Sequence, residues 1–450
     1  MSKKINILVL VTSAPHFPLP TARDSYHQCL KVLRDNFSRE CDFGELPQVI
    51  TGTVGYEEEL AKLKSRNPEI LLLVQGGFTW DNITVYLHSY FGKLPLIQWA
   101  LPERNYHQGQ LGANSLCGMI MNNSALHKLG TAGLSCYGSP DEQETILQLA
   151  GILRTAICSV KIKRAKYGMA GYRPTGFYGS TFDEMKIRRE LGIETIYYDL
   201  SALFDDLERI PAQKIAEDVK AVKRLGKIGE ADQESLVKGS RIYLVLRDFI
   251  QRERIDFLTV RCWPEMMKKG LNPCLVLGRL LDEGVPAGCE ADFGGALSLA
   301  IAAWISAGGS WLADIIDVNK GNSSFYLWHC GAAPCSLAGG KESPVINKQF
   351  RSVNCCNTLE FALQEGDVTV IRFGTTNDRY RIFAFEGKAV LPRVKIRGNI
   401  SEIIPRQKVQ CVLDKIRENG VEQHFAVAYG HYAEQLKNLA AVLKVDFYSV

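Results

Sequence analysis

The sequence lacks a charge excess of either sign, and its first residues lack an apolar run long enough to cross a membrane. Its 450 residues carry 53 Lys and Arg against 49 Asp and Glu, a formal net charge of +4, and no long run of one sign appears. These absences exclude the electrostatic footprint of a nucleic-acid or membrane-surface binder and favour a small-molecule partner. The apolar stretch from Ile5 to Val11 is too short for a signal peptide and predicts a first β-strand in a cytoplasmic protein.

Several common motifs are also missing. The 13 cysteines form no CxxC…CxxC pattern, which argues against a structural zinc site, and in a cytoplasmic protein they are expected to be reduced. The glycine-rich segment GMAGYRPTGFYG (168–179) contains neither GxGxxG in register nor GxxxxGK[ST]. It therefore predicts a tight strand-to-helix turn and not a dinucleotide or P-loop site.

Near-continuous apolar strands alternate with amphipathic helices through most of the chain. Segments such as EILLLVQGG and LPLIQWALP predict a doubly wound, Rossmann-like α/β domain over residues 1–165, with PQVITGTV (47–54) among its strands. The same alternation of strands and helices begins again and predicts a second α/β domain over 166–340. Alternating segments with tight turns then predict a β-rich, barrel-like domain over 341–450 with a terminal helix.

Carboxylates follow two predicted strands of the second domain. RCWPE ends in Glu265 after a buried strand. CEADFGG places Glu290 and Asp292 at the end of another strand, where residues two apart extend from the same face, with Asp292 at the cap of the next helix. Exposed loop acids and a simple helix cap are the alternative interpretation. However, neighbouring parallel strands deliver their last residues to one crevice, and three acids there would repel one another unless a cation were bound. The sequence thus predicts a divalent metal site.

Histidine is scarce, with eight residues in the chain, and a few lie in distinctive settings. His329 lies in WHCG, His424 and His431 flank a short predicted strand, and His16 follows the first strand. Each could equally be a hydrogen-bonded core or surface residue. An oxygen-rich site with one imidazole suits Mn²⁺, Co²⁺ or Mg²⁺, and open positions on such an ion would hold O1 and O2 of a sugar and promote enolisation.

RCWPE, CEADFGGALS, WHCG and HFAVAYGH, in this order, resemble the L-fucose/L-arabinose isomerase superfamily, specifically its fucose-isomerase-like branch. The resemblance implies two α/β domains and a β-rich one, a homo-oligomer (trimer or hexamer) with sites shared between subunits, and Mn²⁺-dependent interconversion of aldoses and ketoses. It also implies that Asp292 and His424 bind the metal.

Other assignments follow from the same resemblance. Glu265 is the best match to the family's metal-binding glutamate, and Glu265 and Asp292 are expected to act as base and acid through a cis-enediol. The remaining candidates, expected to bind substrate or support the metal ligands, are Glu290, His329, His431, Trp263, Arg261 and His16.

The substrate is left open between a free aldose, such as L-fucose or D-arabinose, and a hexose modified at C6, such as sulfoquinovose. An anionic sugar would require a cation, and Arg104, Arg173 and Arg261 lie in suitable loops. Two alternatives remain: a non-catalytic cytoplasmic sugar-binding or sensing protein, and a different metal-dependent enzyme such as an epimerase or lyase.

Overall fold

The computed structural model describes residues 4–103, 111–340, 343–351 and 355–450, and the chain divides into two compact units. The first unit comprises Met1–Lys161 and Lys437–Lys444, and the second comprises Ile162–Leu436 and Val445–Val450. The domain boundaries predicted after residues 165 and 340 remain predictions.

The first unit contains a five-stranded parallel sheet in the order β2-β1-β3-β4-β5. Its central strands are buried along almost their whole length, as expected for a parallel sheet covered on both faces. The strands are β1 (Ile5–Thr12), β2 (Cys41–Glu45), β3 (Ile70–Gln75), β4 (Leu96–Ala100) and β5 (Gly133–Tyr137).

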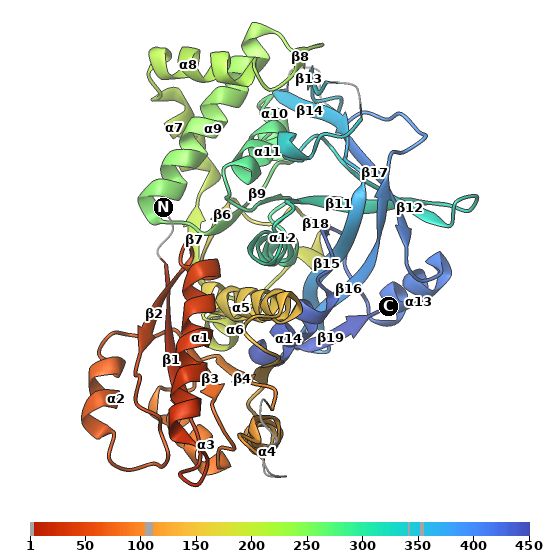
Figure 1. Cartoon of the computed structure of the whole chain (residues 1–450). Coiled ribbons are helices and arrows are strands. Elements are labelled where there is room, and N and C mark those ends of the chain that lie inside the picture. The colour runs from red at the N-terminus through yellow and green to blue at the C-terminus, as the bar shows by residue number, and fades with distance from the viewer. Residues whose placement is uncertain (1–3, 104–110, 341–342, 352–354) are drawn as a thin grey trace. The chain divides into compact units, whose positions relative to one another are not determined.

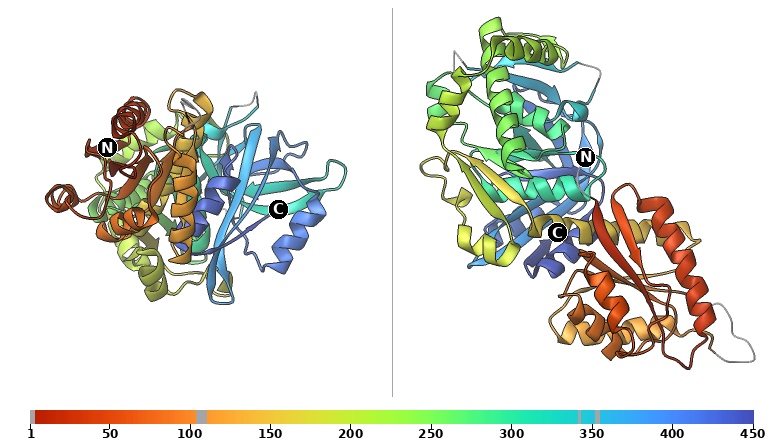
Figure 2. Two further views of the ribbon diagram at one scale, coloured as in Figure 1. Left: turned by 60° about the horizontal axis from the view of Figure 1, so that its bottom comes forward. Right: turned by 90° about the vertical axis from the view of Figure 1, so that its left-hand side faces the viewer.

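Helices cover both faces of this sheet (Figure 2). Alternate residues of β1 pack against α1 and α5 on one face and against α2, α3 and α4 on the other. Within the described residues, α5 is the one helix long and apolar enough to cross a membrane, but 61% of its apolar window is buried inside the protein, as in a core helix. The helices are α1 (Leu19–Phe37), α2 (Glu57–Lys64), α3 (Asp81–Tyr90), α4 (Ser115–Lys128) and α5 (Gln143–Lys163).

The strand predicted over residues 47–54 is wrong. The structure places β2 at Cys41–Glu45, and within 47–54 only Ile50 forms an isolated bridge, to Thr12. Gly52 and Gly55 interrupt the apolar stretch, whereas β2 is a half-exposed edge strand whose polar sequence CDFGE gives little apolar signal.

The second unit begins with a four-stranded parallel sheet in the order β10-β9-β6-β7, as the α/β prediction requires. Its strands are β6 (Lys166–Ala170), β7 (Glu194–Tyr198), β9 (Phe257–Val260) and β10 (Ala287–Cys289). Its helices are α6 (Glu184–Leu191), α7 (Leu200–Glu208), α8 (Ala212–Val222), α9 (Gln233–Glu253), α10 (Glu265–Lys268), α11 (Cys274–Asp282) and α12 (Phe293–Ile305).

An antiparallel six-stranded barrel follows in the same unit, confirming the predicted fold class (Figure 1). The ring closes because β16 pairs with both β15 and β17. The barrel strands are β11 (Ser310–Asn319), β12 (Ser324–His329), β15 (Gly366–Thr376), β16 (Arg379–Val390), β17 (Asn399–Pro405) and β18 (Phe425–Tyr429). The sheet is extended by β8 (Lys227–Ile228), β13 (Val345–Lys348), β14 (Asn357–Ala362) and β19 (Asp446–Ser449), and the last helices are α13 (Val409–Glu418) and α14 (Ala433–Leu443).

Helix α12 joins the four-stranded sheet to the barrel. It packs against β9 and β10 on one side and against β11, β15 and β18 on the other (Figure 1). Its sequence FGGALSLAIAAWI is apolar all round because both sides of the helix are buried. The helix therefore fixes the carboxyl end of β10 relative to the barrel.

Helix α9 offers a direct test of local stability. Asp232 forms a capping box with Ser235, and its pKa is lowered first by the Lys348 ammonium group and then by the Ser235 N–H. Asp232→Ala is expected to reduce the free energy of unfolding by about 1 kcal/mol. Because the folded-state pKa is lowered, this contribution is fully present above the unfolded pKa, near 3.8, and is lost as pH falls from there through the lower folded-state pKa.

The matched control is Asp199→Ala at the start of α7, where the side chain makes no capping hydrogen bond. Urea unfolding at pH 7 and near pH 3 should show a smaller difference between the two variants at the lower pH. An equal loss for both substitutions would contradict the capping role.

Candidate metal centre

The site forms where β10 ends and α12 begins. Glu290 and Ala291 both have left-handed backbone angles, with φ of 58° and 51°, so the chain reverses between Cys289 and Asp292. Such angles are costly for residues other than glycine and concentrate at functional sites. The prediction that Glu290 and Asp292 extend from one face of a strand is wrong, because the strand stops at Cys289 and both carboxylates belong to the turn.

His424 lies among three carboxylates and is 1% exposed. Its Nδ1 lies 2.9 Å from Asp292 Oδ2, while its Nε2 lies 3.3 Å from Glu290 Oε2 and 3.7 Å from Asp314 Oδ1. Burial alone would lower the pKa of His424, but the hydrogen bonds to Asp292 and Glu290 outweigh it and raise the pKa well above its usual value. The structure thus brings the predicted residues Glu290, Asp292 and His424 together.

Asp292 forms a buried ion pair with an arginine. Arg372, on β15, donates from Nη1 to Oδ2 at 2.7 Å and from Nη2 to Oδ1 at 3.2 Å, and both side chains are 1% exposed. Burial would raise the pKa of Asp292, but the Arg372 charge and the His424 hydrogen bond lower it. Both carboxylate oxygens of Asp292 therefore have protein partners, and Oδ2 fixes the orientation of the His424 ring.

Asp314 on β11 is the residue that the sequence analysis missed. Among the described residues its buried Oδ1 accepts no hydrogen bond, and it lies 3.7 Å from His424 Nε2. A buried carboxylate oxygen is costly unless it faces a positive charge, so this oxygen is suited to contact a cation. The available signal was a single acid within the apolar stretch WLADII (311–316), which belongs to the barrel. Glu290 and Asp314 thus place two carboxylates near one imidazole nitrogen, and these donor types suit a divalent cation.

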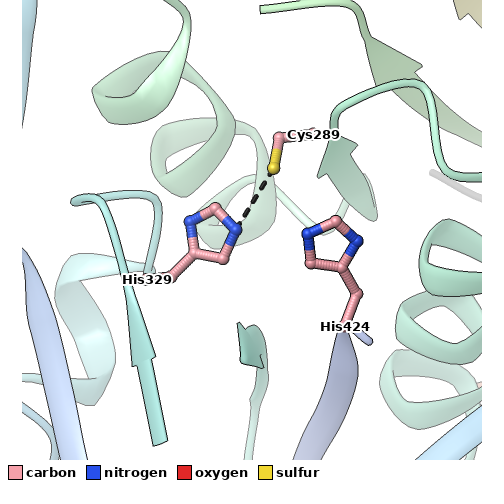
Figure 3. Close-up of side chains that lie close together, drawn as sticks. All are labelled: Cys289, His329 and His424. Carbon is pink, nitrogen blue, oxygen red and sulfur yellow. Dashed lines mark hydrogen bonds between the residues drawn. The ribbon is translucent and has the colours of Figure 1, made fainter. Parts of the chain in front are cut away.

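Cys289, His329 and His424 form a second, overlapping group (Figure 3). Cys289 Sγ lies 3.2 Å from His329 Nε2, and one potential ligand atom from each of the three residues lies within 4.8 Å of the others. The Cys330 backbone N–H donates to His329 Nδ1 at 3.0 Å, so the proton of the neutral ring is on Nε2, facing Cys289. This buried Cys/His/His group could also bind a metal ion.

The predicted residues that follow β9 lie at the same sheet edge. Trp263 donates from Nε1 to Glu290 Oε1 at 3.1 Å, and Arg261 donates to Glu265 Oε1 at 2.7 Å. Glu265 Oε2 is buried and accepts no hydrogen bond from a described residue. A Cβ on Gly171 would lie 2.9 Å from Arg261 Cβ, so a glycine at this left-handed position, with φ of 77°, lets the loop after β6 approach Arg261.

Among the remaining candidates of the second unit, His431 and Arg173 contact other residues. His431 is past the opposite end of β18 from His424 and contacts Asp367, Glu386 and Arg406. His16 belongs to the first unit, where its ring lies 4.7 Å from Phe17 and 6.1 Å from Trp80. Arg173 stacks over Tyr172 and Tyr178 in the loop after β6. Arg104 lies outside the described residues.

The chain shows sequence similarity to enzymes from several bacteria. The sulfoquinovose isomerase of Priestia aryabhattai is 27% identical over 406 residues, which cover 89% of each chain. The sulfoquinovose isomerase of Alkalicoccus urumqiensis is 27% identical over 358 residues, covering 78% of this chain and 80% of its own. That of Clostridium sp. (strain MSTE9) is 25% identical over 459 residues and 98% of both chains. No protein-family model matches. The protein is therefore a distant homologue of sulfoquinovose isomerases over most of its length.

Proposed function

We propose that this protein is a metal-dependent aldose–ketose isomerase that acts on a hexose with an anionic group at C6, of the sulfoquinovose type, through a cis-enediol. The observation that carries the proposal is the convergence of Glu290 and Asp314 on Nε2 of the buried His424. The relatives named sulfoquinovose isomerase support both the reaction and the class of sugar.

Glu290, Asp314 and His424 would hold the cation, and Asp292 would fix the ring of His424 through its bond to Nδ1. Mn²⁺ suits this donor set, and Co²⁺ or Mg²⁺ would also fit. When bound, the cation would supply Lewis-acid polarisation of the sugar carbonyl group. In this proposal Asp292 orients a ligand and does not bind the metal itself.

Glu290 is suited to remove the proton from C2. Burial would raise its pKa, but the hydrogen bond to His424 and the charges of His424 and His329 lower it, so the carboxylate is ionised at neutral pH. Glu290 would take the proton from C2, leaving the cis-enediol, and return it to C1. The hydroxyl proton moves from O2 to O1 in the same conversion, and Glu265, with its free Oε2, is the candidate to move it.

Glu265→Gln tests this part of the mechanism. The substitution keeps an acceptor for the Arg261 hydrogen bond but removes the group that exchanges a proton. We expect kcat to fall by about 10²–10⁴-fold, as for loss of a general acid or base, with Mn²⁺ affinity retained. Steady-state kinetics and Mn²⁺ binding should be compared with Glu253→Gln at the exposed end of α9. Full activity in Glu265→Gln would remove Glu265 from the mechanism.

The decisive experiment for the proposed function is a substrate screen. Chelator-stripped protein with Mn²⁺ added back is incubated in D₂O with sulfoquinovose, L-fucose, D-arabinose and L-arabinose, and the products are followed by NMR. Formation of sulfofructose is the expected result, with deuterium at C1 to the extent that the protonated Glu290 exchanges with D₂O before the proton is returned. Turnover of neutral sugars alone would contradict the anionic substrate. Metal binding without turnover of any sugar would favour a sugar-binding protein, and an epimer or cleavage product would indicate a different reaction.

The predicted homo-oligomer with sites shared between subunits also remains a proposal. Light scattering coupled to size exclusion would test the trimer or hexamer directly.

A further inference from the structure

The pocket around His424 contains two chemically different donor sets. The carboxylates of Glu290 and Asp314 lie on the Nε2 side of the ring, and the thiol of Cys289 and the imidazole of His329 lie beside it. We propose that Cys289, His329 and His424 form a separate site for a thiophilic cation such as Zn²⁺ or Cd²⁺, and that this site excludes the cation of the isomerase site. Inhibition of the isomerase would rest on the proposed function, whereas the binding site itself does not.

The three side chains are already spaced for tetrahedral coordination. Zn–S and Zn–N bonds of 2.3 and 2.0–2.1 Å place neighbouring sulfur and nitrogen ligands about 3.5 Å apart. Cys289 Sγ and His329 Nε2 are 3.2 Å apart, and all three ligand atoms lie within 4.8 Å of one another. All three residues are buried, so they need little rearrangement to enclose an ion.

The two sites exclude each other because they share one nitrogen. Nδ1 of His424 is bound to Asp292 and so only Nε2 can bind an ion. Nε2 can belong either to the set with Glu290 and Asp314 or to the set with Cys289 and His329. A cation in the second set therefore takes a ligand away from the first.

The chemical type of the donor atoms determines which ion each set of ligands binds. Thiolate and imidazole ligands select Zn²⁺ over Mn²⁺, which also lies below Zn²⁺ in the general order of affinities. Binding through His329 Nε2 moves the ring proton to Nδ1 and breaks the hydrogen bond from the Cys330 N–H. Loss of one such bond costs about fivefold in affinity. Structural zinc sites reach binding constants on the order of 10⁷–10¹² per molar, so this cost does not prevent binding.

Cd²⁺ and Zn²⁺ titrations of the full-length, metal-stripped protein test the proposal. Cd²⁺ bound to a thiolate gives a charge-transfer absorption in the near ultraviolet, which requires no sugar turnover. We expect one tight equivalent with this absorption in the parent protein. Cys289→Ser should abolish the absorption and lower Zn²⁺ affinity by at least about a hundredfold, since even loss of a partner outside the ligand set costs 10–100-fold.

Three further variants identify which residues bind the ion. His329→Gln should weaken Zn²⁺ binding while keeping the thiol, and it serves as the second variant if Cys289→Ser does not fold by circular dichroism. Cys411→Ser, at an exposed position on α13, is the matched control and should bind Zn²⁺ as the parent does. Cys262→Ser tests the neighbouring group of Cys262, Cys289 and Glu290, and it should leave the absorption in place.

Several outcomes would overturn the inference. One is undiminished Zn²⁺ binding in Cys289→Ser. Another is loss of the absorption in Cys262→Ser with retention in His329→Gln, which would move the ion to the neighbouring group. A third is a fall in Mn²⁺ affinity as large as the fall in Zn²⁺ affinity in Cys289→Ser, because it would mean that one site binds both ions. Absence of sugar turnover together with the Cd²⁺ absorption would contradict only the isomerase proposal.

Discussion

Asp314→Asn is expected to lower Mn²⁺ affinity by at least about a hundredfold and to reduce turnover at limiting Mn²⁺ in proportion. The substitution preserves shape but removes the charge of one of the three proposed ligands, and loss of a residue that only supports ligands already costs 10–100-fold. Because Asp314 Oδ1 accepts no hydrogen bond from any described residue, the change breaks none there. Isothermal titration with Mn²⁺ measures the affinity, and the Mn²⁺ dependence of kcat measures the second effect.

Asp317→Asn is the matched control for this experiment. Asp317 lies three residues further along β11, where its exposed carboxylate accepts a hydrogen bond from the Val318 N–H. We expect its Mn²⁺ affinity and turnover to match those of the parent protein. An Asp314→Asn variant with the parent's Mn²⁺ affinity would leave Glu290 and His424 as an incomplete ligand set and would contradict the proposed centre.

Arg372→Met is expected to destabilise the second unit by about 3–5 kcal/mol. The substitution removes two hydrogen bonds to the Asp292 carboxylate and leaves its charge buried in the interior. Glu422, which pairs with Arg372 at 3.4 Å, keeps Arg381 at 2.8 Å as a partner. Urea unfolding of the metal-free protein, followed by tryptophan fluorescence, measures the loss.

Two further variants identify the cause of this destabilisation. Arg379→Met removes an exposed ion pair with Asp446 from the neighbouring strand β16, and it should cost less than about 1 kcal/mol. The double variant Arg372→Met/Asp292→Asn removes the uncompensated charge and should recover part of the stability. A double variant no more stable than Arg372→Met would show that the guanidinium group acts through its packing and not through its charge.

The parallel sheets could be predicted because their strands are buried on both faces. β3 and β4 are mostly apolar and fully buried, and β9 and β10 are neighbours, so the expectation that their last residues share one edge is confirmed. The edge strand β2 could not be predicted from the same signal, because Asp42 and Glu45 face solvent. The antiparallel hairpin of β15 and β16 is confirmed, but residues 368–374 of β15 are all buried, so the expected alternation is absent there.

The candidate site was only partly predictable because its residues are distant in the sequence. Asp292 and His424 were expected to lie together, and they do. Asp314 carries no motif of its own, and its importance depends on the closure of the barrel, which brings β11 beside β18. The closeness of Glu290 to His424 depends on two consecutive left-handed residues, neither of them glycine, which no local sequence preference indicates.

The division of the site between two substructures has a mechanical consequence. Cys289, Glu290 and Asp292 come from the end of the four-stranded sheet, whereas Asp314, His329, Arg372 and His424 come from the barrel, with α12 between them. A cation held by Glu290, Asp314 and His424 would act as a cross-link that resists sliding of the sheet against the barrel. A bound ion would then restrict local opening throughout the second unit. Loss of the ion would increase these opening motions and also abolish catalysis.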